Sequence, residues 1–372
     1  MSSFVFWGGF GWDDGTALLY IGMGCLVGFL GFVSSRVKDT RQSFLFLLLA
    51  SLFLIFFKGF CVSGVDVKIG GGYYKNFMSA TSLSSFRDGS TELGYRLLTV
   101  GVRGLTDSYG IYLLIVSAVS IVPVIYVLWK LRKDINLAFA LMGYALIFIV
   151  TGMSAMRQFM AVGLGVLAVF YYFTKRYGHF VAAFVLAVSI HTSALCLILL
   201  LGFSLVKNRR WLQLFIAFLV VALCVVGRIA IGSLFTGRYA VYTVGDNLDF
   251  GAAVLLKYVP IALLLIAVEN RILSSSSDCA LLRDRFDNCW TVLVFSACMA
   301  LIGYVVGIFG RAESFSAPIV IVIAYLIRQC EDERYFRIPI KGLVFCYFLF
   351  RFLLYMNDGY LAEGLMPYLS WI

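Results

Sequence analysis

The stretch SAMRQFMAVGLGV, residues 154–166, decides the fold, because an arginine and a glutamine open a long apolar run. A run of about 20 mostly apolar residues can cross the hydrocarbon core of a bilayer as a helix. Such runs recur from Thr16 to Tyr355 with short polar breaks. They are continuously apolar and do not alternate, which favours helices over a β-barrel. The sequence therefore predicts an all-α polytopic membrane protein with about 10–11 transmembrane helices.

The composition supports the same class. Of the 372 residues, 62% are hydrophobic and 13% are charged, and the mean hydropathy is +0.94, which excludes a soluble globular protein. The formal charge of +10 lies mainly in short loops between apolar runs. Membrane orientation and anionic membrane lipid account for this charge without nucleic acid. We treat residues 1–372 as a single integral membrane domain.

The cysteines and histidines predict neither a metal site nor a cofactor. Six of the nine cysteines lie inside apolar runs, where they are expected to act as small buried hydrophobic residues. The two histidines, His179 and His191, are 12 residues apart, and no CxxC motif accompanies them.

Basic loops predict the topology, since loops rich in Lys and Arg face the cytoplasm. Residues 34–42, 130–134 and 174–178 then share the cytoplasmic side. This places residues 58–109 outside, as a segment with interfacial helices. Within it, Glu92, Arg96, Thr99 and Arg103 share one face of a helix that is otherwise apolar. Glu92 and Arg96, four residues apart, are expected to support each other.

The stretch 179–205 breaks this alternation. A single crossing would put ten cations of the later loops outside, whereas a return to the cytoplasm puts the same ten inside. The positive-inside rule favours the return. The stretch is too short for two full spans, so it would form a re-entrant hairpin with His191 near its tip. One long tilted helix is the alternative.

Three arginines are candidates for binding an anion at the external face. Arg157 begins its helix from outside, where a cation opposes the helix dipole unless an anion is bound. Arg311 lies in a short external turn, and Arg238 in a longer external loop. Guanidinium groups make paired hydrogen bonds to phosphate oxygens. Brought together, the three arginines would form a pyrophosphate site.

Several of these residues carry a resemblance to a known family. Asp66 and Tyr74 precede ELGY at 92–95; RQxxA follows at 157–161, HTSA at 191–194, and then Arg311. This order and spacing, over most of the chain, resembles the EpsG-type branch of the Wzy-like polysaccharide polymerases. The sequence departs from the family near Asp66, where the usual acidic stretch is replaced by GVDVKIGGGYY with its glycine run.

The resemblance implies a glycosyltransferase of the bacterial cytoplasmic (inner) membrane that is similar in architecture to the GT-C enzymes. It would transfer a growing O-antigen or exopolysaccharide chain from undecaprenyl pyrophosphate onto an incoming lipid-linked repeat unit, at the periplasmic or external face. A flippase and a chain-length regulator of the same pathway, as for lipopolysaccharide, are the expected protein partners.

The chemistry assigns roles to these residues. A base must take a proton from the attacking hydroxyl, and Glu92 is the first choice, with His191 and Asp66 behind it. Charge on the departing pyrophosphate needs stabilisation, which arginines can supply in place of a metal ion. We therefore expect a metal-independent site in which Arg157, Arg311 and Arg238 bind pyrophosphate, and Gln158, Arg96 and Tyr239 support them.

Two other functions are compatible with the sequence. Membrane O-acyltransferases that modify glycans also pair an arginine with a histidine, although Arg157 and His191 are 34 residues apart here. A flippase or transporter of lipid-linked oligosaccharides would also need many spans and a basic cavity. Transporters often contain an internal repeat of broken helices, and none is visible in this chain.

Overall fold

The computed structural model describes residues 13–64, 67–86, 91–234, 256–275, 279–305, 307–331, 334–356, 365 and 368–370. The named elements in these ranges are all helices, which confirms the predicted all-α class. Nine of the described segments are long and apolar enough to cross a membrane. They are Asp14–Arg36, Thr40–Phe60, Tyr109–Leu131, Leu137–Ser154, Met156–Phe173, Arg210–Gly227, Ala280–Tyr304, Ala312–Gln329 and Arg337–Met356. Helix α13 (Val259–Ser275), with 17 residues, falls just below that length.

The chain divides into two compact units, each described here by itself. The first comprises Met1–Thr192 and Arg334–Ile372, and the second comprises Ser193–Glu333. The sequence predicts a single membrane domain, and that expectation stays a prediction.

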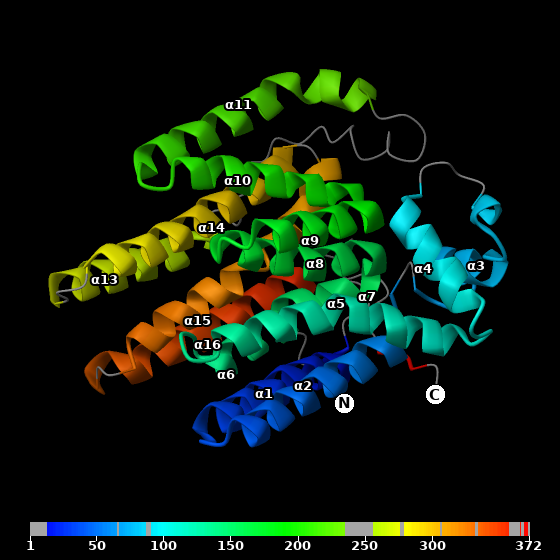
Figure 1. The fold of residues 1–372 in the computed structure, drawn as a ribbon, viewed down its shortest axis with the longest axis horizontal. Helices are drawn as coiled ribbons and strands as arrows, with labels where there is room; N and C mark the ends of the chain where they lie inside the picture. The colour runs from blue at the N-terminus through cyan, green and yellow to red at the C-terminus, as the bar shows by residue number, and fades with distance from the viewer. Residues whose placement is uncertain are drawn as a thin grey trace, which may run out of the picture. The chain divides into compact units, whose positions relative to one another are not determined.

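Three helices, α2, α5 and α8, form a packed row in the first unit, with α1 against α2 and α9 against α8 (Figure 1). Polar caps begin several of these helices: the Asp13 carboxylate accepts a hydrogen bond from Thr16 N at 2.9 Å, and Asp39 accepts one from Arg41 N at 2.8 Å. Gly163 allows α8 to approach α5 closely, because a Cβ there would lie 2.9 Å from the Ser120 carbonyl carbon. The helices of the row and its neighbours are α1 (Asp14–Arg36), α2 (Thr40–Phe60), α5 (Tyr109–Leu131), α6 (Leu137–Gly143), the π-helix η2 (Tyr144–Ile149), α7 (Val150–Ser154), α8 (Met156–Phe173), α9 (Tyr177–Ile190) and α16 (Arg334–Met356).

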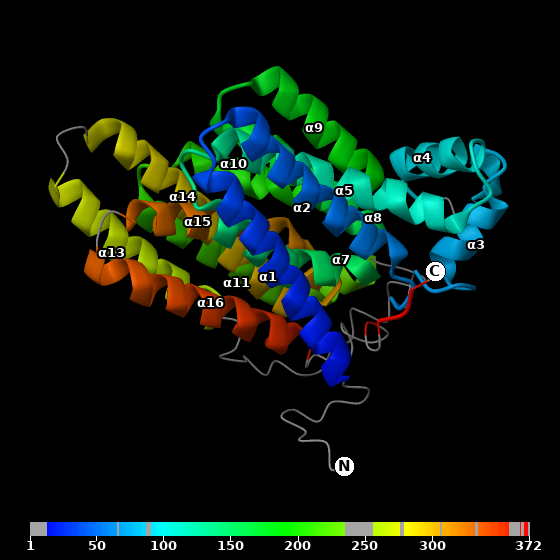
Figure 2. The ribbon, with the colours of Figure 1, turned by 90° about the horizontal axis from the view of Figure 1, so that it is seen from below.

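The predicted external segment contains two short helices and a 3₁₀ turn. These are α3 (Gly72–Ser79), η1 (Leu83–Ser85) and α4 (Leu93–Arg103). Helices α3 and α4 pack against each other and against α5, as the cyan ribbons in Figures 1 and 2 show, and η1 packs on α4. Helix α4 also packs on α9. The described parts of this segment therefore form helices that belong to the first unit.

Helix α14 (Cys279–Val305) is the centre of the second unit. It contacts α10 (Leu197–Leu205), α11 (Arg210–Leu234), α13, the 3₁₀ segment η5 (Gly307–Ser316) and α15 (Ile319–Gln329). Large apolar side chains on α11 are exposed, including Phe218 at 70%. Such a surface is suited to contact with lipid.

The stretch 179–205 is broken at His191. Helix α9 ends at Ile190, His191 is extended with φ −151° and ψ 119°, and the chain resumes as the 3₁₀ turn η3 (Thr192–Cys196) before α10. The alternative of one long helix is therefore wrong. The return of the chain to its side of entry stays a prediction.

Candidate functional site

The ends of three helices of the first unit, α4, α8 and α9, meet at the carboxylate of Glu92. Glu92 precedes α4, and its Oε2 accepts a hydrogen bond from Arg157 Nη1 at 3.0 Å, from the first turn of α8. Its Oε1 accepts hydrogen bonds from Thr192 N at 3.1 Å and Thr192 Oγ1 at 3.3 Å, just after α9. His191 Nδ1 lies 3.8 Å from the same oxygen. Residues that are 65 to 100 positions apart in the sequence are thus joined by one carboxylate.

This assembly is largely withdrawn from solvent. The side chains of Arg157, Glu92 and His191 are 13%, 11% and 15% exposed. A buried ion pair is tolerated when further hydrogen bonds satisfy its oxygens, and here both Glu92 oxygens have such partners. Glu92 also supplies the anion that a cation near the N-terminus of α8 requires.

Tyrosines form the wall behind Arg157. The guanidinium carbon lies 5.3 Å from the centre of the Tyr95 ring and 5.8 Å from that of Tyr73, and Nε donates to the Tyr73 hydroxyl at 3.4 Å. The Tyr112 hydroxyl donates to that of Tyr95 at 3.0 Å. Burial raises the pKa of Tyr95 well above its ordinary value, so this phenol stays neutral.

Nη2 of Arg157 is not used within this assembly. Nη1 and Nε have the partners given above, and among the described residues no group accepts a hydrogen bond from Nη2. The guanidinium of Arg157 is therefore held in a fixed orientation, and the edge at Nη2 can still donate hydrogen bonds. Such an edge can bind an oxygen of a phosphate group.

Helix α4 presents Glu92 because its two faces differ. Tyr95, Thr99 and Val102 are buried on one face, and Leu93 and Leu97 are more than half exposed on the other. Gly94 allows α4 to meet α9, because a Cβ there would overlap the Ser189 hydroxyl and lie 2.7 Å from the Ser189 carbonyl oxygen. The predicted polar face of α4 is present, and it is turned toward the rest of the protein.

The predicted pairing of Glu92 with Arg96 is wrong. Glu92 pairs with Arg157 instead, and Nε of Arg96 is buried without a hydrogen-bond partner within the described chain. An ion pair between residues four apart on a helix stabilises it by only a few tenths of a kcal/mol. The partly buried contacts that the Glu92 carboxylate makes between α4, α8 and α9 stabilise it more than such a local pair would. Gln158 is buried, with 2% of its surface exposed.

Arg311 belongs to η5 in the second unit, and its side chain lies outside the described part. The neighbouring Glu313 fixes this segment: it accepts hydrogen bonds from Lys257 Nζ at 2.9 and 3.1 Å and from the Tyr258 hydroxyl at 3.1 Å. Asp66, Arg238 and Tyr239 also lie outside the described residues. The meeting of Arg157 with Arg311 and Arg238 stays a prediction.

Sequence reasoning gave no role to three polar residues of the first unit, although one of them, Thr192, belongs to the HTSA motif. Tyr73 bonds Arg157, although only its neighbour Tyr74 had a motif position, and Thr192 holds Glu92 mainly through its backbone. Lys58, 5% exposed in the last turn of α2, donates to Ser120 Oγ at 2.9 Å and lies over the Phe159 ring. A lysine within an apolar run was a signal that could have revealed this last contact.

The potential metal ligands among the described residues do not indicate a metal centre. Among the described residues, no group of three or more His, Cys, Asp or Glu side chains is arranged to hold a metal ion. The charges at Glu92 are instead balanced by Arg157 and by backbone donation from Thr192.

Comparison with known proteins identifies the family of this chain. The family model described as the EpsG family matches residues 44–370. No curated protein and no solved structure matches the chain. The matched region includes all of α4, α8 and α9, and with them Glu92, Arg157 and His191. On that match the chain belongs to the EpsG family, which is of the Wzy-like polysaccharide polymerase type.

Proposed function

We propose that this protein is a polysaccharide polymerase of the bacterial cytoplasmic membrane that acts on repeat units linked to undecaprenyl pyrophosphate. The observation that carries the proposal is the junction of Arg157, Glu92, Thr192 and His191. In this junction, Arg157 supplies a cation that can stabilise a negatively charged leaving group, and His191 supplies an imidazole that can accept a proton. Membership of the EpsG family supports a polymerase role for this junction.

The reaction requires one bond to form and one to break. The hydroxyl oxygen of the incoming unit bonds to the anomeric carbon of the growing chain, and the bond from that carbon to the pyrophosphate oxygen breaks. The hydroxyl proton goes to a base, and undecaprenyl pyrophosphate departs with the electron pair. We assign binding of the departing phosphate to the Nη2 edge of Arg157, an electrostatic role that can replace a metal ion.

We assign the base to His191 and a positioning role to Glu92. Both oxygens of Glu92 are occupied by Arg157 and Thr192. The carboxylate faces Nδ1 of His191, which directs Nε2 away from it. A carboxylate that orients an imidazole for proton transfer is an established catalytic arrangement. Arg311, Arg238 and Asp66 remain candidates for further contacts with substrate.

Lipid-linked repeat units added to the purified protein in proteoliposomes test this function, with products separated as a ladder. The proposal predicts long chains that form with and without EDTA. Single units that remain unextended would contradict it.

An external active site predicts elongation of units presented only at the outer surface of right-side-out vesicles. A flippase would move units across the membrane without lengthening them. A chain-length regulator and a flippase of the same pathway are the proposed protein partners.

One observation favours a second candidate function. The structure brings Arg157 and His191 to the same carboxylate despite their distance in sequence, which is the pairing expected of a membrane O-acyltransferase. Labelled acetyl-CoA supplied in the same vesicles separates the two functions, because only an acyltransferase would transfer label to the glycan.

A further inference from the structure

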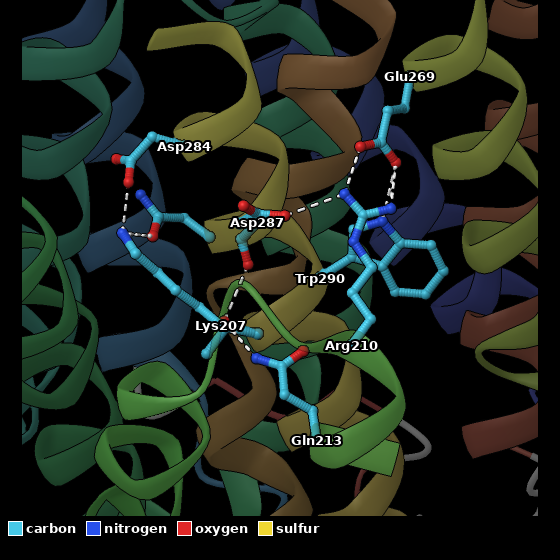
Figure 3. Close-up of polar contacts among 9 residues, drawn as sticks. Lys207, Arg210, Gln213, Glu269, Asp284, Asp287 and Trp290 are labelled. Carbon is cyan, nitrogen blue, oxygen red and sulfur yellow. Dashed lines mark hydrogen bonds and ion pairs between the residues drawn. The ribbon is translucent and has the colours of Figure 1, made fainter. Parts of the chain in front are cut away.

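A second polar cluster, independent of the proposed active site, lies in the second unit where the α10–α11 turn meets α13 and α14 (Figure 3). Its centre is Arg210. The guanidinium bonds both oxygens of Glu269, one of them at 2.7 Å, and Asp287 Oδ1 at 3.0 Å. Trp290 Nε1 donates to Glu269 at 3.0 Å, and its ring lies beside Arg210.

Each carboxylate of this cluster has a cationic partner. Glu269 and Asp287 are only 4% and 6% exposed, and Arg210 holds both. Asp284 is paired with Lys207 at 2.6 Å. Arg210 carries one positive charge against the two negative charges of Glu269 and Asp287, so one negative charge remains there for other cations of the pocket to offset.

The cluster forms one side of a surface pocket of about 890 Å³ that has further cations at its edge. Arg209 and Arg283 line this pocket, are exposed, and make no ion pair within the described chain. Together with Lys207 and Arg210, these two arginines make four cations, against the three carboxylates of Glu269, Asp284 and Asp287. Asn208 adds a neutral polar group to the lining. The pocket thus has a surplus of donors suited to phosphate oxygens.

An apolar surface continues from the pocket along α11. Trp211, itself a lining residue, is 68% exposed, and Leu214, Phe215 and Phe218 after it are 55%, 56% and 70% exposed. Tryptophan is enriched at the level of lipid headgroups, and exposed Leu and Phe are suited to acyl chains. A polar pocket above an apolar helix face matches the two parts of a phospholipid.

We propose that this pocket binds the phosphate headgroup of an anionic phospholipid, whose acyl chains lie along the exposed face of α11. Arg209 and Arg283 would contact the phosphate, and Trp211 would lie at the boundary between headgroup and chains. The basic α10–α11 turn assigns the site to the cytoplasmic leaflet. A basic pocket between transmembrane helices is a known setting for anionic headgroups.

Lipid titration of the purified full-length chain tests the proposal. The measurement is the thermal midpoint in detergent with added dioleoyl phosphatidylglycerol, dioleoyl phosphatidylcholine or soluble glycerol phosphate. Phosphatidylglycerol should raise the midpoint at lower concentrations than the other two. The Arg209→Gln/Arg283→Gln variant should need a higher phosphatidylglycerol concentration for the same rise, by roughly fivefold for each arginine removed.

The Arg41→Gln variant is the matched control, because it removes an arginine of the first unit that is also exposed. It should respond to phosphatidylglycerol like the parent protein. An equal loss of response in Arg41→Gln, or an unchanged response in the double variant, would overturn the proposal. Glycerol phosphate that acts as well as the lipid would overturn the lipid assignment in favour of a soluble anion. A double variant that unfolds without lipid is replaced by Arg283→Gln alone, with the same criteria.

Discussion

Arg157 is held by more groups than a surface arginine would be. It contacts the Glu92 carboxylate, the hydroxyl and ring of Tyr73 and the ring of Tyr95, and Nη2 remains without a partner among the described residues. The free energy cost of desolvating this cation is offset by Glu92, whose other oxygen is satisfied by Thr192. The site is therefore preorganised before any substrate binds.

The Glu92→Gln variant should destabilise the first unit. The amide oxygen can still accept from Thr192, but Arg157 would keep a charge that is only 13% exposed and has no counter-ion. Removal of one member of a buried ion pair costs about 3 kcal/mol in unfolding free energy. Thermal unfolding of Glu92→Gln, Arg157→Gln and the double variant measures this. The double variant should be more stable than the two single effects predict together, and strict additivity would contradict the pairing.

The His191→Gln variant should lose activity with little loss of stability. Removal of a general base typically lowers the rate by roughly 10²- to 10⁴-fold. The elongation rate in proteoliposomes checks this, and the thermal midpoint controls for folding. An elongation rate close to that of the parent protein would contradict the assignment of His191 and would mean that Glu92 or Asp66 acts as the base.

At the scale of the element, helix α4 decides where Glu92 lies. The sequence predicts its polar face correctly, and the structure turns that face toward the protein, with Thr99 fully buried. The pairing of Glu92 could not be predicted, because periodicity relates neighbours within one helix and Arg157 is 65 residues away. The break at His191 was one of two alternatives, and the count of loop charges favoured it over one long helix without locating it in the structure.

Gly94→Ala should reduce activity by displacing α4 from α9. The new Cβ would overlap the Ser189 hydroxyl and press on its carbonyl, so the contact of Glu92 with Thr192 would open. Gly101→Ala is the control on the same helix, since nothing lies within 4 Å of its Cβ. We expect at least a tenfold lower elongation rate for Gly94→Ala, because such displacements cost up to about 100-fold. Equal rates for the two variants would contradict the close-contact explanation.

Lys58→Met should leave the packing of α2, α5 and α8 intact. The lysine amine is buried and has no carboxylate partner among the described residues, so it carries a desolvation cost that methionine lacks. Ser120 Oγ keeps its other hydrogen bond, to the Ser117 carbonyl at 2.8 Å. The thermal midpoint should be unchanged or higher. A decrease by several degrees would mean that the amine contributes more than its contacts with Ser120 and Phe159 indicate.

At the scale of the whole molecule, the all-α class followed directly from composition and run length. Nine described segments meet the requirements for spanning a membrane. Sequence reasoning could not reveal the ion cluster at Arg210, because its acids come from α13 and α14, 59 and 77 residues away. Asp66, Arg238 and Tyr239 lie outside the described residues, so their roles stay predictions.

The predicted orientation can be measured by cysteine labelling in intact cells with a membrane-impermeant maleimide. Leu105→Cys, at a position 85% exposed after α4, should react from outside. Asn208→Cys, in the basic α10–α11 turn, should react only after the cells are permeabilised. The parent protein gives the background from its own cysteines. The reverse pattern would place the Glu92 site on the cytoplasmic side.

The most direct test of the central claim is the single-turnover elongation rate of Arg157→Lys, with Arg103→Lys of α4 as the matched control. Lysine keeps the charge but loses the fixed geometry that presents Nη2 to a phosphate. The account predicts a rate lower by about 10²- to 10³-fold for Arg157→Lys, and a rate within about twofold of the parent protein for Arg103→Lys. Equal rates for the two variants would contradict a role for Arg157 in holding the departing pyrophosphate.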